Sequence, residues 1–219
     1  MIEFEKIKNN NDVQILIAKS DEYLKSIGYT VHGLEHVEEV TRRAEKIAKD
    51  TELDEYDVQA SCIAAYLHDI GNFLGRENHQ LSGALIAFNI LKEMNIDINL
   101  ISKVATAIAS HDETNGEITD KVSAVLILAD KSHVHKNRVR GKDPSKFDIH
   151  DRVNYAARKS NIIVDKLGKT ITLKLEINTK ISQVMEYFEI FLERMIISRK
   201  AAQFLGCEFR LKINNIRLL

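Results

Sequence analysis

The sequence predicts a mainly α-helical protein that ends in a small α+β domain. Up to about residue 140, apolar residues recur at the spacing of helices that bury one face. In the last third of the chain, residues 170–177 alternate between apolar and polar side chains, which is typical of a half-buried strand. We therefore expect a helical domain over residues 1–145 and an α+β domain over residues 146–219.

The helices of the first domain are predicted to begin near residues 12, 34, 54, 78, 99 and 120. Asp12 is expected to cap the first helix, and Gly71 is expected to stop the third. The apolar run 122–129 fits a buried strand as well as a helix on periodicity alone. Its alanine content and its capping-type start near Asp120 favour a central helix.

The second domain is predicted to have the element order ββαβ. A strand over 162–164 would pair with the strand over 170–177 through a turn at 166–169. A long helix from about Thr179 to Leu205 and an alternating segment from Cys207 follow. The basic and polar segment 136–148, which contains Gly141 and Pro144, is interpreted as a linker or a functional loop.

The composition excludes several classes of partner. The chain has 219 residues, a formal net charge of −1 and 29% charged residues, which gives no basis for a nucleic-acid polymer or a membrane as partner. Two cysteines, Cys62 and Cys207, do not form a disulfide framework. The start of the chain lacks the layout of a signal peptide, so we expect a cytoplasmic location. The edge of the C-terminal sheet predicts a homodimer.

The most informative residues are His68 and Asp69, which end the apolar helical segment 64–67. Polar groups at the end of an apolar helix either satisfy each other and the backbone or hold a metal. Asp130 also ends an apolar run, where an unpaired carboxylate would be costly. Further candidates on predicted helices are His36, His79 and His111. Taken singly, a buried histidine is more often a satisfied core residue, but the set predicts a metal site with nitrogen and oxygen ligands.

In order and local context, these residues resemble the signature of the HD-domain superfamily of metal-dependent phosphohydrolases. The resemblance spans about residues 30–135, and its elements are His36-Val37-Glu38-Glu39-Val40, Leu67-His68-Asp69-Ile70-Gly71 and Leu128-Ala129-Asp130-Lys131. The elements Glu77-Asn78-His79 with Gly83-Ala84, and Ser110-His111-Asp112, resemble the subgroup that binds two metals. Members of that subgroup often carry paired histidines where this chain has Ser110 and His111, which predicts a weaker or more open second site.

The resemblance implies a helical HD-domain bundle with two divalent ions at its centre, from the group Fe, Mn, Ni, Co and Zn. The first ion would be held by His36, His68, Asp69 and Asp130, and the second by Asp69, His79 and His111. In the resembling enzymes, a metal-bound water attacks phosphorus. The implied activity is that of a phosphomonoesterase or phosphodiesterase acting on a small phosphorylated substrate such as a nucleotide, with Asp69 as a catalytic residue.

Basic residues follow the ligand candidate Asp130 and predict a site for the phosphate of the substrate. Lys131 is predicted to be catalytic and to hold a phosphate oxygen, and the rim would be formed by Arg138, Arg140 and Lys142. The alternative is a solvated charge run. His32 lies one helical turn before His36, and it either faces the substrate, takes the role of His36 as a ligand or lies at the surface. His133 and His135 are not predicted as ligands.

Two other functions use the same residue types. A di-iron oxygenase of the HD type would cleave C–C or C–P bonds with the same ligands. A regulatory module would sense a nucleotide without hydrolysing it, with the C-terminal domain as a relay or dimerisation unit. Oxygen consumption with iron would indicate the first alternative, and nucleotide binding without turnover would indicate the second.

Overall fold

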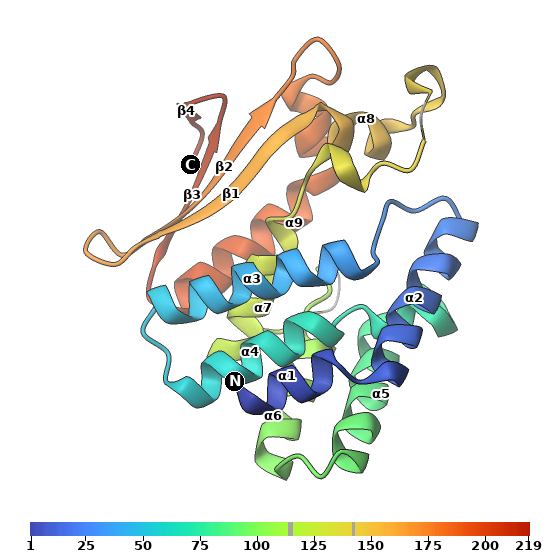
Figure 1. The fold of residues 1–219 in the computed structure, drawn as a ribbon. Helices are drawn as coiled ribbons and strands as arrows, with labels where there is room; N and C mark the ends of the chain where they lie inside the picture. Colours follow the sequence, from blue (N-terminus) through green and yellow to red (C-terminus); the bar gives the residue numbers. More distant parts are fainter. Residues whose placement is uncertain (114–115, 142) are drawn as a thin grey trace.

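The computed structural model describes residues 1–113, 116–141 and 143–219 of the chain, so the rim candidate Lys142 lies outside the described residues. The helices form a bundle in the first part of the chain, and a small sheet with its own long helix follows (Figure 1). This confirms the predicted fold class, which is mainly α with a small sheet after the helices.

The α-helices are α1 (Ile2–Lys8), α2 (Asn11–Ser26), α3 (Leu34–Asp50), α4 (Glu55–Leu67), α5 (His79–Glu93), α6 (Ile98–Ala109), α7 (Lys121–Lys131), α8 (Ile149–Ala156) and α9 (Val184–Phe204). Short 3-10 turns lie at Ile70–Leu74, Lys136–Arg138 and Pro144–Lys146.

Two of the predicted helix ends are wrong. Asn10, rather than Asp12, caps α2, because the Asn10 side chain accepts a hydrogen bond from the Val13 amide. Helix α4 ends at Leu67, and Gly71 lies inside the 3-10 turn that follows. Gly71 is needed there for close packing rather than as a helix stop, since an added Cβ would lie 2.1 Å from the carbonyl oxygen of His79.

Helix α7 is the central helix of the bundle, as predicted for the run 122–129. Asp120 caps it by accepting a hydrogen bond from the Ser123 amide, and every residue from Val122 to Lys131 is buried. It packs against α3, α4, α6 and α9. A helix that is apolar on all sides is buried on all sides. Asp130, in the last turn of this helix, therefore lies in the interior.

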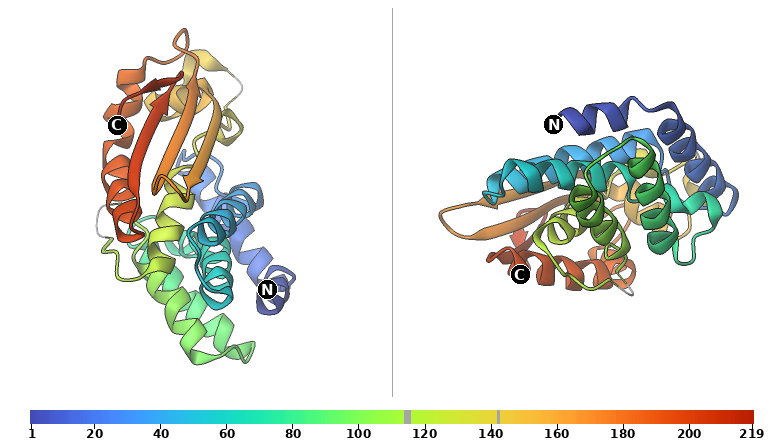
Figure 2. Two further views of the ribbon diagram at one scale, coloured as in Figure 1. Left: turned by 90° about the vertical axis from the view of Figure 1, so that its left-hand side faces the viewer. Right: turned by 90° about the horizontal axis from the view of Figure 1, so that it is seen from below.

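The sheet has the strand order β1-β2-β3-β4, with β1 (Ala157–Asp165), β2 (Thr170–Ile177), β3 (Glu208–Ile213) and β4 (Ile216–Arg217). β1 and β2 form the predicted hairpin, and β3 lies parallel to β2 because α9 carries the chain back across the sheet. Figure 2 shows α9 running along the sheet. Within the described residues β4 extends the predicted ββαβ order. The homodimer inferred from a free sheet edge stays a prediction.

The helical bundle and the sheet are joined by buried contacts. Helix α9 packs on α7 as well as on β3, and the buried apolar residues form one cluster that continues from the bundle into the sheet. Arg43 of α3 donates hydrogen bonds to the carbonyl oxygens of Ser132 and Ser160, each at 2.7 Å. The boundary at residues 145 and 146 stays a prediction. Among the described helices, none is long and apolar enough to cross a membrane.

Candidate metal centre

His68 and Asp69 lie in the protein interior, at the point where α4 gives way to a 3-10 turn. The apolar end of α4 is buried on all sides, so the two residues that follow it are buried as well. Nδ1 of His68 lies 2.8 Å from the carbonyl oxygen of Ala65, and the side chain of Asn72 donates to Oδ1 of Asp69 at 2.9 Å. These contacts fix the imidazole and the carboxylate.

A first group of donors meets around Nε2 of His68. His36 comes from the first turn of α3, and its Nε2 lies 3.3 Å from Nε2 of His68. Asp130 comes from the last turn of α7, and its Oδ1 lies 3.4 Å from Nε2 of His36 and 3.6 Å from Nε2 of His68. Atoms of all three buried side chains lie close enough together to hold one metal ion.

A second group lies on the other side of Asp69. Nε2 of His79, the first residue of α5, lies 3.2 Å from Nε2 of His111 and 3.6 Å from Oδ1 of Asp69. The other oxygen of Asp69, Oδ2, lies 3.2 Å from Nε2 of His68. His68, Asp69 and His111 can also share one ion. The two oxygens of Asp69 therefore face different histidines, which is the arrangement expected of a carboxylate between two ions.

The hydrogen bonds of the ring nitrogens explain why these donors need a cation. Nδ1 of His68, His79 and His111 each lies near the backbone carbonyl three residues earlier, at 2.8, 3.1 and 2.6 Å. A carbonyl only accepts, so Nδ1 carries the proton and Nε2 of a neutral ring presents a lone pair. Two such lone pairs 3.2 Å apart, as in His79 and His111, cannot bond to each other. A metal ion satisfies both, and the residues present therefore fit a divalent metal.

The charges of the cluster also favour a cation at its centre. Burial opposes a charge on His68, but the carboxylates of Asp69 and Asp130 outweigh it and raise the pKa of His68 to about 10. Burial, followed by the charge of Arg138, holds the pKa of His36 well below its usual value, and burial does the same for the pKa of His111. The carboxylates thus favour one positive charge at His68 while the neighbouring rings stay neutral.

The comparisons with known proteins agree with this geometry. The family model described as the HD domain matches residues 33–135, a range that contains all of the predicted metal ligands. This match identifies an HD domain within the chain. Its match to an uncharacterized protein, MJ1020, from Methanocaldococcus jannaschii is 30% identical over 172 residues, which is 68% of this chain and 66% of that protein.

A solved structure is also similar to this HD-domain chain. The crystal structure of a predicted HD superfamily hydrolase from an uncultured Thermotogales bacterium is 27% identical, with a TM-score of 0.44. The match covers 55% of this chain and 65% of that one. The chain thus spans about two thirds of the length of both relatives.

Lys131 of the HD domain is buried between two carboxylates. Its Nζ lies 2.9 Å from Oδ2 of Asp130 and 2.5 Å from Oε2 of Glu113. Glu113 also pairs with Nε of Arg194 in α9 at 3.4 Å. The geometry gives Lys131 a role in holding the ligand candidate Asp130, and its predicted contact with a phosphate oxygen stays a prediction.

The two predicted rim arginines have different surroundings. Arg138 is buried, and its guanidinium donates to the carbonyl oxygens of Val31 and His133 and, at 2.7 Å, to Nε2 of His32. Arg140 forms an ion pair with Asp21 at 2.5 Å and donates to the backbone carbonyls of Asp21, Tyr29 and Thr30. Arg140 thus ties the segment before α3 to α2, whereas Arg138 lies beside the centre.

A cavity of about 400 Å³ lies beside the metal ligands, between the bundle and helices α8 and α9. Three arginines line it, namely Arg76, Arg138 and Arg194, and so do three acidic residues, namely Glu113, Asp148 and Asp151. Nη1 of Arg76 lies 3.8 Å from Oδ1 of Asp69, and the guanidinium of Arg194 lies 4.4 Å from the ring centre of Phe191. The sequence analysis missed Arg76 and Arg194. Arg76 lies between two motif elements, but nothing local in the sequence of α9 identifies Arg194.

Proposed function

We propose that this protein is a metal-dependent phosphohydrolase that acts on a small phosphate ester. The observation that carries the proposal is the juxtaposition of the buried histidine and aspartate cluster with a cavity lined by three arginines. His36, His68, Asp69 and Asp130 would hold the first divalent ion, and Asp69, His79 and His111 the second. When bound, such ions supply an activated water and neutralise the charge that develops on a phosphate in displacement.

The arginines of the cavity are the groups that would bind the phosphate. Guanidinium groups pair with phosphate oxygens through two parallel hydrogen bonds, and the pairing is strong where water is excluded. Arg76 is linked to the cluster through Asp69, and Arg194 through Glu113 and Lys131. A phosphate held by these side chains would lie next to the metal ligands. Tyr29 and Phe191, which also line the cavity, would contact the organic part of the ester.

His32 is assigned a positioning role in this proposal. Its Nδ1 lies 2.6 Å from the carbonyl oxygen of Thr30, so its Nε2 accepts the hydrogen bond from Arg138. Burial and the charge of Arg138 lower the pKa of His32 well below its usual value. The neutral ring can therefore orient the Arg138 guanidinium toward the cavity, but it has no free proton to donate to a leaving group.

The first test is the metal content of the full chain, purified without a His-tag or chelator, and of the His68→Ala variant. We expect about two ions per chain in the wild type and their loss in the variant. Release of p-nitrophenol from p-nitrophenyl phosphate and from bis(p-nitrophenyl) phosphate then separates monoesterase from diesterase activity. Glu193→Ala, at an exposed position of α9, is the matched control and should keep both the metal and the activity.

Other outcomes would contradict the proposal in defined ways. Bound iron, oxygen uptake and no hydrolysis of either ester would indicate a di-iron oxygenase instead of a hydrolase. Nucleotide binding without turnover by the metal-loaded protein would indicate a sensing module. Absence of bound metal after reconstitution with manganese, nickel, cobalt, iron and zinc would contradict both enzyme functions.

A further inference from the structure

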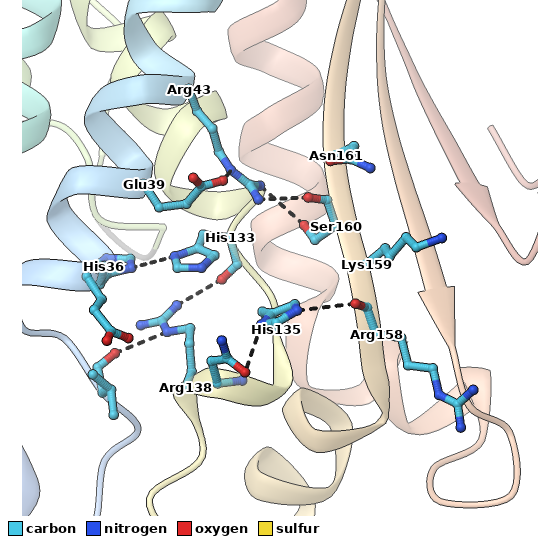
Figure 3. A pocket seen from close by; sticks show the side chains of 13 residues that line it. His36, Glu39, Arg43, His133, His135, Arg138, Arg158, Lys159, Ser160 and Asn161 are labelled. Atoms are coloured by element: carbon cyan, nitrogen blue, oxygen red, sulfur yellow. Dashed lines mark hydrogen bonds and ion pairs between the residues drawn. The ribbon is translucent and has the colours of Figure 1, made fainter.

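A second pocket, of about 390 Å³, lies between α3, the segment after α7 and the edge strand β1 (Figure 3). His36 takes part in both sites, because its Nε2 faces the metal ligands and its Nδ1 lies 2.9 Å from His133. Both of these histidines line the second pocket. The pocket is therefore separated from the metal centre by the ring of His36. Among the described residues it shares one lining residue, Arg138, with the cavity between the bundle and α9.

Positive charge dominates the lining of this second pocket. Four permanently cationic side chains line it, namely Arg43, Arg138, Arg158 and Lys159, whereas its acidic residues are Glu35 and Glu39. Glu39 is already neutralised, because Arg42 and Arg43 donate hydrogen bonds to it. Lys159 also pairs with Glu176, from outside the lining, at 3.1 Å. Four cations thus face three carboxylates, in a chain whose net charge is −1.

Arg138 contributes a buried positive charge that forms no direct ion pair among the described residues, and the more distant carboxylates of Asp130 and Asp69 offset only part of the cost of its burial. Its side chain is 5% exposed, and within the described part of the chain its hydrogen bonds go only to two carbonyl oxygens and to the ring of His32. The undescribed residues Thr114, Asn115 and Lys142 include no carboxylate. A buried charge is costly unless it is paired, so a guanidinium in this setting favours a nearby anion.

A β-bulge presents the other two cations to the pocket. The register of β1 against β2 shifts between Ala157 and Lys159, so the side chains of Arg158 and Lys159 are both exposed instead of alternating between the faces of the sheet. The ring of His135 fixes the backbone at this bulge through a contact of 3.2 Å with the carbonyl oxygen of Arg158. In Figure 3 these residues of β1 lie across the pocket from His36 and Glu39.

We propose that this pocket binds a small phosphate-bearing ligand, at a site separate from the metal centre. Arg158 and Lys159 would provide the charge at the entrance, Arg138 the charge at the base, and Asn137 and Asn161 neutral hydrogen-bond donors. The volume of the pocket suits a small molecule rather than a polymer. The site would give the C-terminal sheet a role in binding, and it does not depend on the reaction proposed above.

Equilibrium dialysis of the full-length protein, as purified, against radiolabelled inorganic phosphate tests the proposal by counting bound phosphate per chain. We expect one site at the metal centre and another in the second pocket. The double variant Arg158→Glu and Lys159→Glu should weaken the second site at least tenfold. The matched control is Arg199→Glu with Lys200→Glu, an exposed arginine and lysine pair in α9 that lines neither pocket. It makes the same change in net charge and should alter the affinity by less than twofold.

A further variant, Arg76→Gln with Arg194→Gln, distinguishes this proposal from the proposed function. It should weaken phosphate binding at the metal centre and leave the second site intact. If the hydrolase proposal fails and the second-site proposal holds, the wild type still binds phosphate in the second pocket, and Arg158→Glu with Lys159→Glu abolishes that binding. The second-site proposal is overturned if that double variant binds as much phosphate as the wild type, or loses no more than the Arg199 and Lys200 control. Circular dichroism of each variant confirms that it is folded.

Discussion

Nδ1 of His133 lies 2.9 Å from Nδ1 of His36, and the two rings are stacked, with an angle of 7° between their planes. The other nitrogen of His36 faces the metal ligands. If that nitrogen is to bind a metal, Nδ1 of His36 must carry the proton and donate it to His133. His133 then accepts the hydrogen bond from Nδ1 of His36, as backbone carbonyls do for His68, His79 and His111.

Substitution of His133 is therefore expected to weaken metal binding although His133 is not a ligand candidate. His133→Leu removes the acceptor that orients His36, and loss of such an outer partner lowers metal affinity by about 10- to 100-fold. Competition with a chelator of known affinity measures the effect. His135→Leu, on the same segment, is the control and should keep the wild-type affinity. Equal metal affinity in the His133 and wild-type proteins would contradict the assigned role.

Substitution of Lys131 separates its structural role from a role in substrate binding. Lys131→Met leaves the carboxylates of Asp130 and Glu113 buried without their shared cation, and breaking a buried ion pair in this way costs about 3–5 kcal/mol. Urea denaturation should show this loss of stability, together with weaker metal binding. Lys121→Met, at an exposed position of the same helix, should leave both unchanged. A stable variant that keeps its metal but has a raised KM would instead support the predicted contact with phosphate.

The positions of the candidate metal ligands could be predicted because they depend on local sequence. His68, Asp69 and Asp130 end apolar helices, and the positions of such ends are visible in the hydrophobic pattern. The orientation of the rings is local too, since His68, His79 and His111 each bond to a carbonyl three residues earlier. Residues whose surroundings are set within one helical turn are accessible to sequence reasoning.

The surroundings of the cluster could not be predicted, because they depend on contacts between distant segments. Arg194 reaches Glu113 across 81 positions of the chain, and His133 reaches His36 across 97. The hydrophobic periodicity of the sequence does not reveal such long-range pairs. The bulge at Arg158 involves a contact with His135, 23 positions earlier, and the parallel pairing of β2 with β3 depends on how α9 packs on the bundle. The tight packing at Gly71 involves the carbonyl of His79, which the sequence near Gly71 does not reveal.

The two cysteines are expected to differ in reactivity. Burial raises the pKa of the Cys62 thiol to about 12, and a smaller degree of burial raises the pKa of Cys207. Only the thiolate is nucleophilic, so Cys62 should stay unreactive at pH 8 in the folded protein, and its reactivity should rise only as the pH approaches 12. Titration with a chromogenic disulfide reagent should show one slowly reacting thiol in the native protein and two in urea. The variant Cys207→Ser should show none until it unfolds, and rapid native labelling of that variant would contradict the prediction.

Gly71→Ala tests whether the packing of the turn after α4 controls the metal centre. The added Cβ would lie 2.1 Å from the His79 carbonyl oxygen and 2.5 Å from the Gly83 amide nitrogen, so the backbone of α5 must move. Because His79 begins that helix, we expect a loss of about 3 kcal/mol in the free energy of unfolding together with weaker binding of the second ion. Gly28→Ala is the control. It has a positive φ of 86° but no atom within 4 Å of the new Cβ, so it should cost only about 1 kcal/mol and keep the metal. Equal losses in the two variants would contradict the prediction that contact with α5 sets the cost at Gly71.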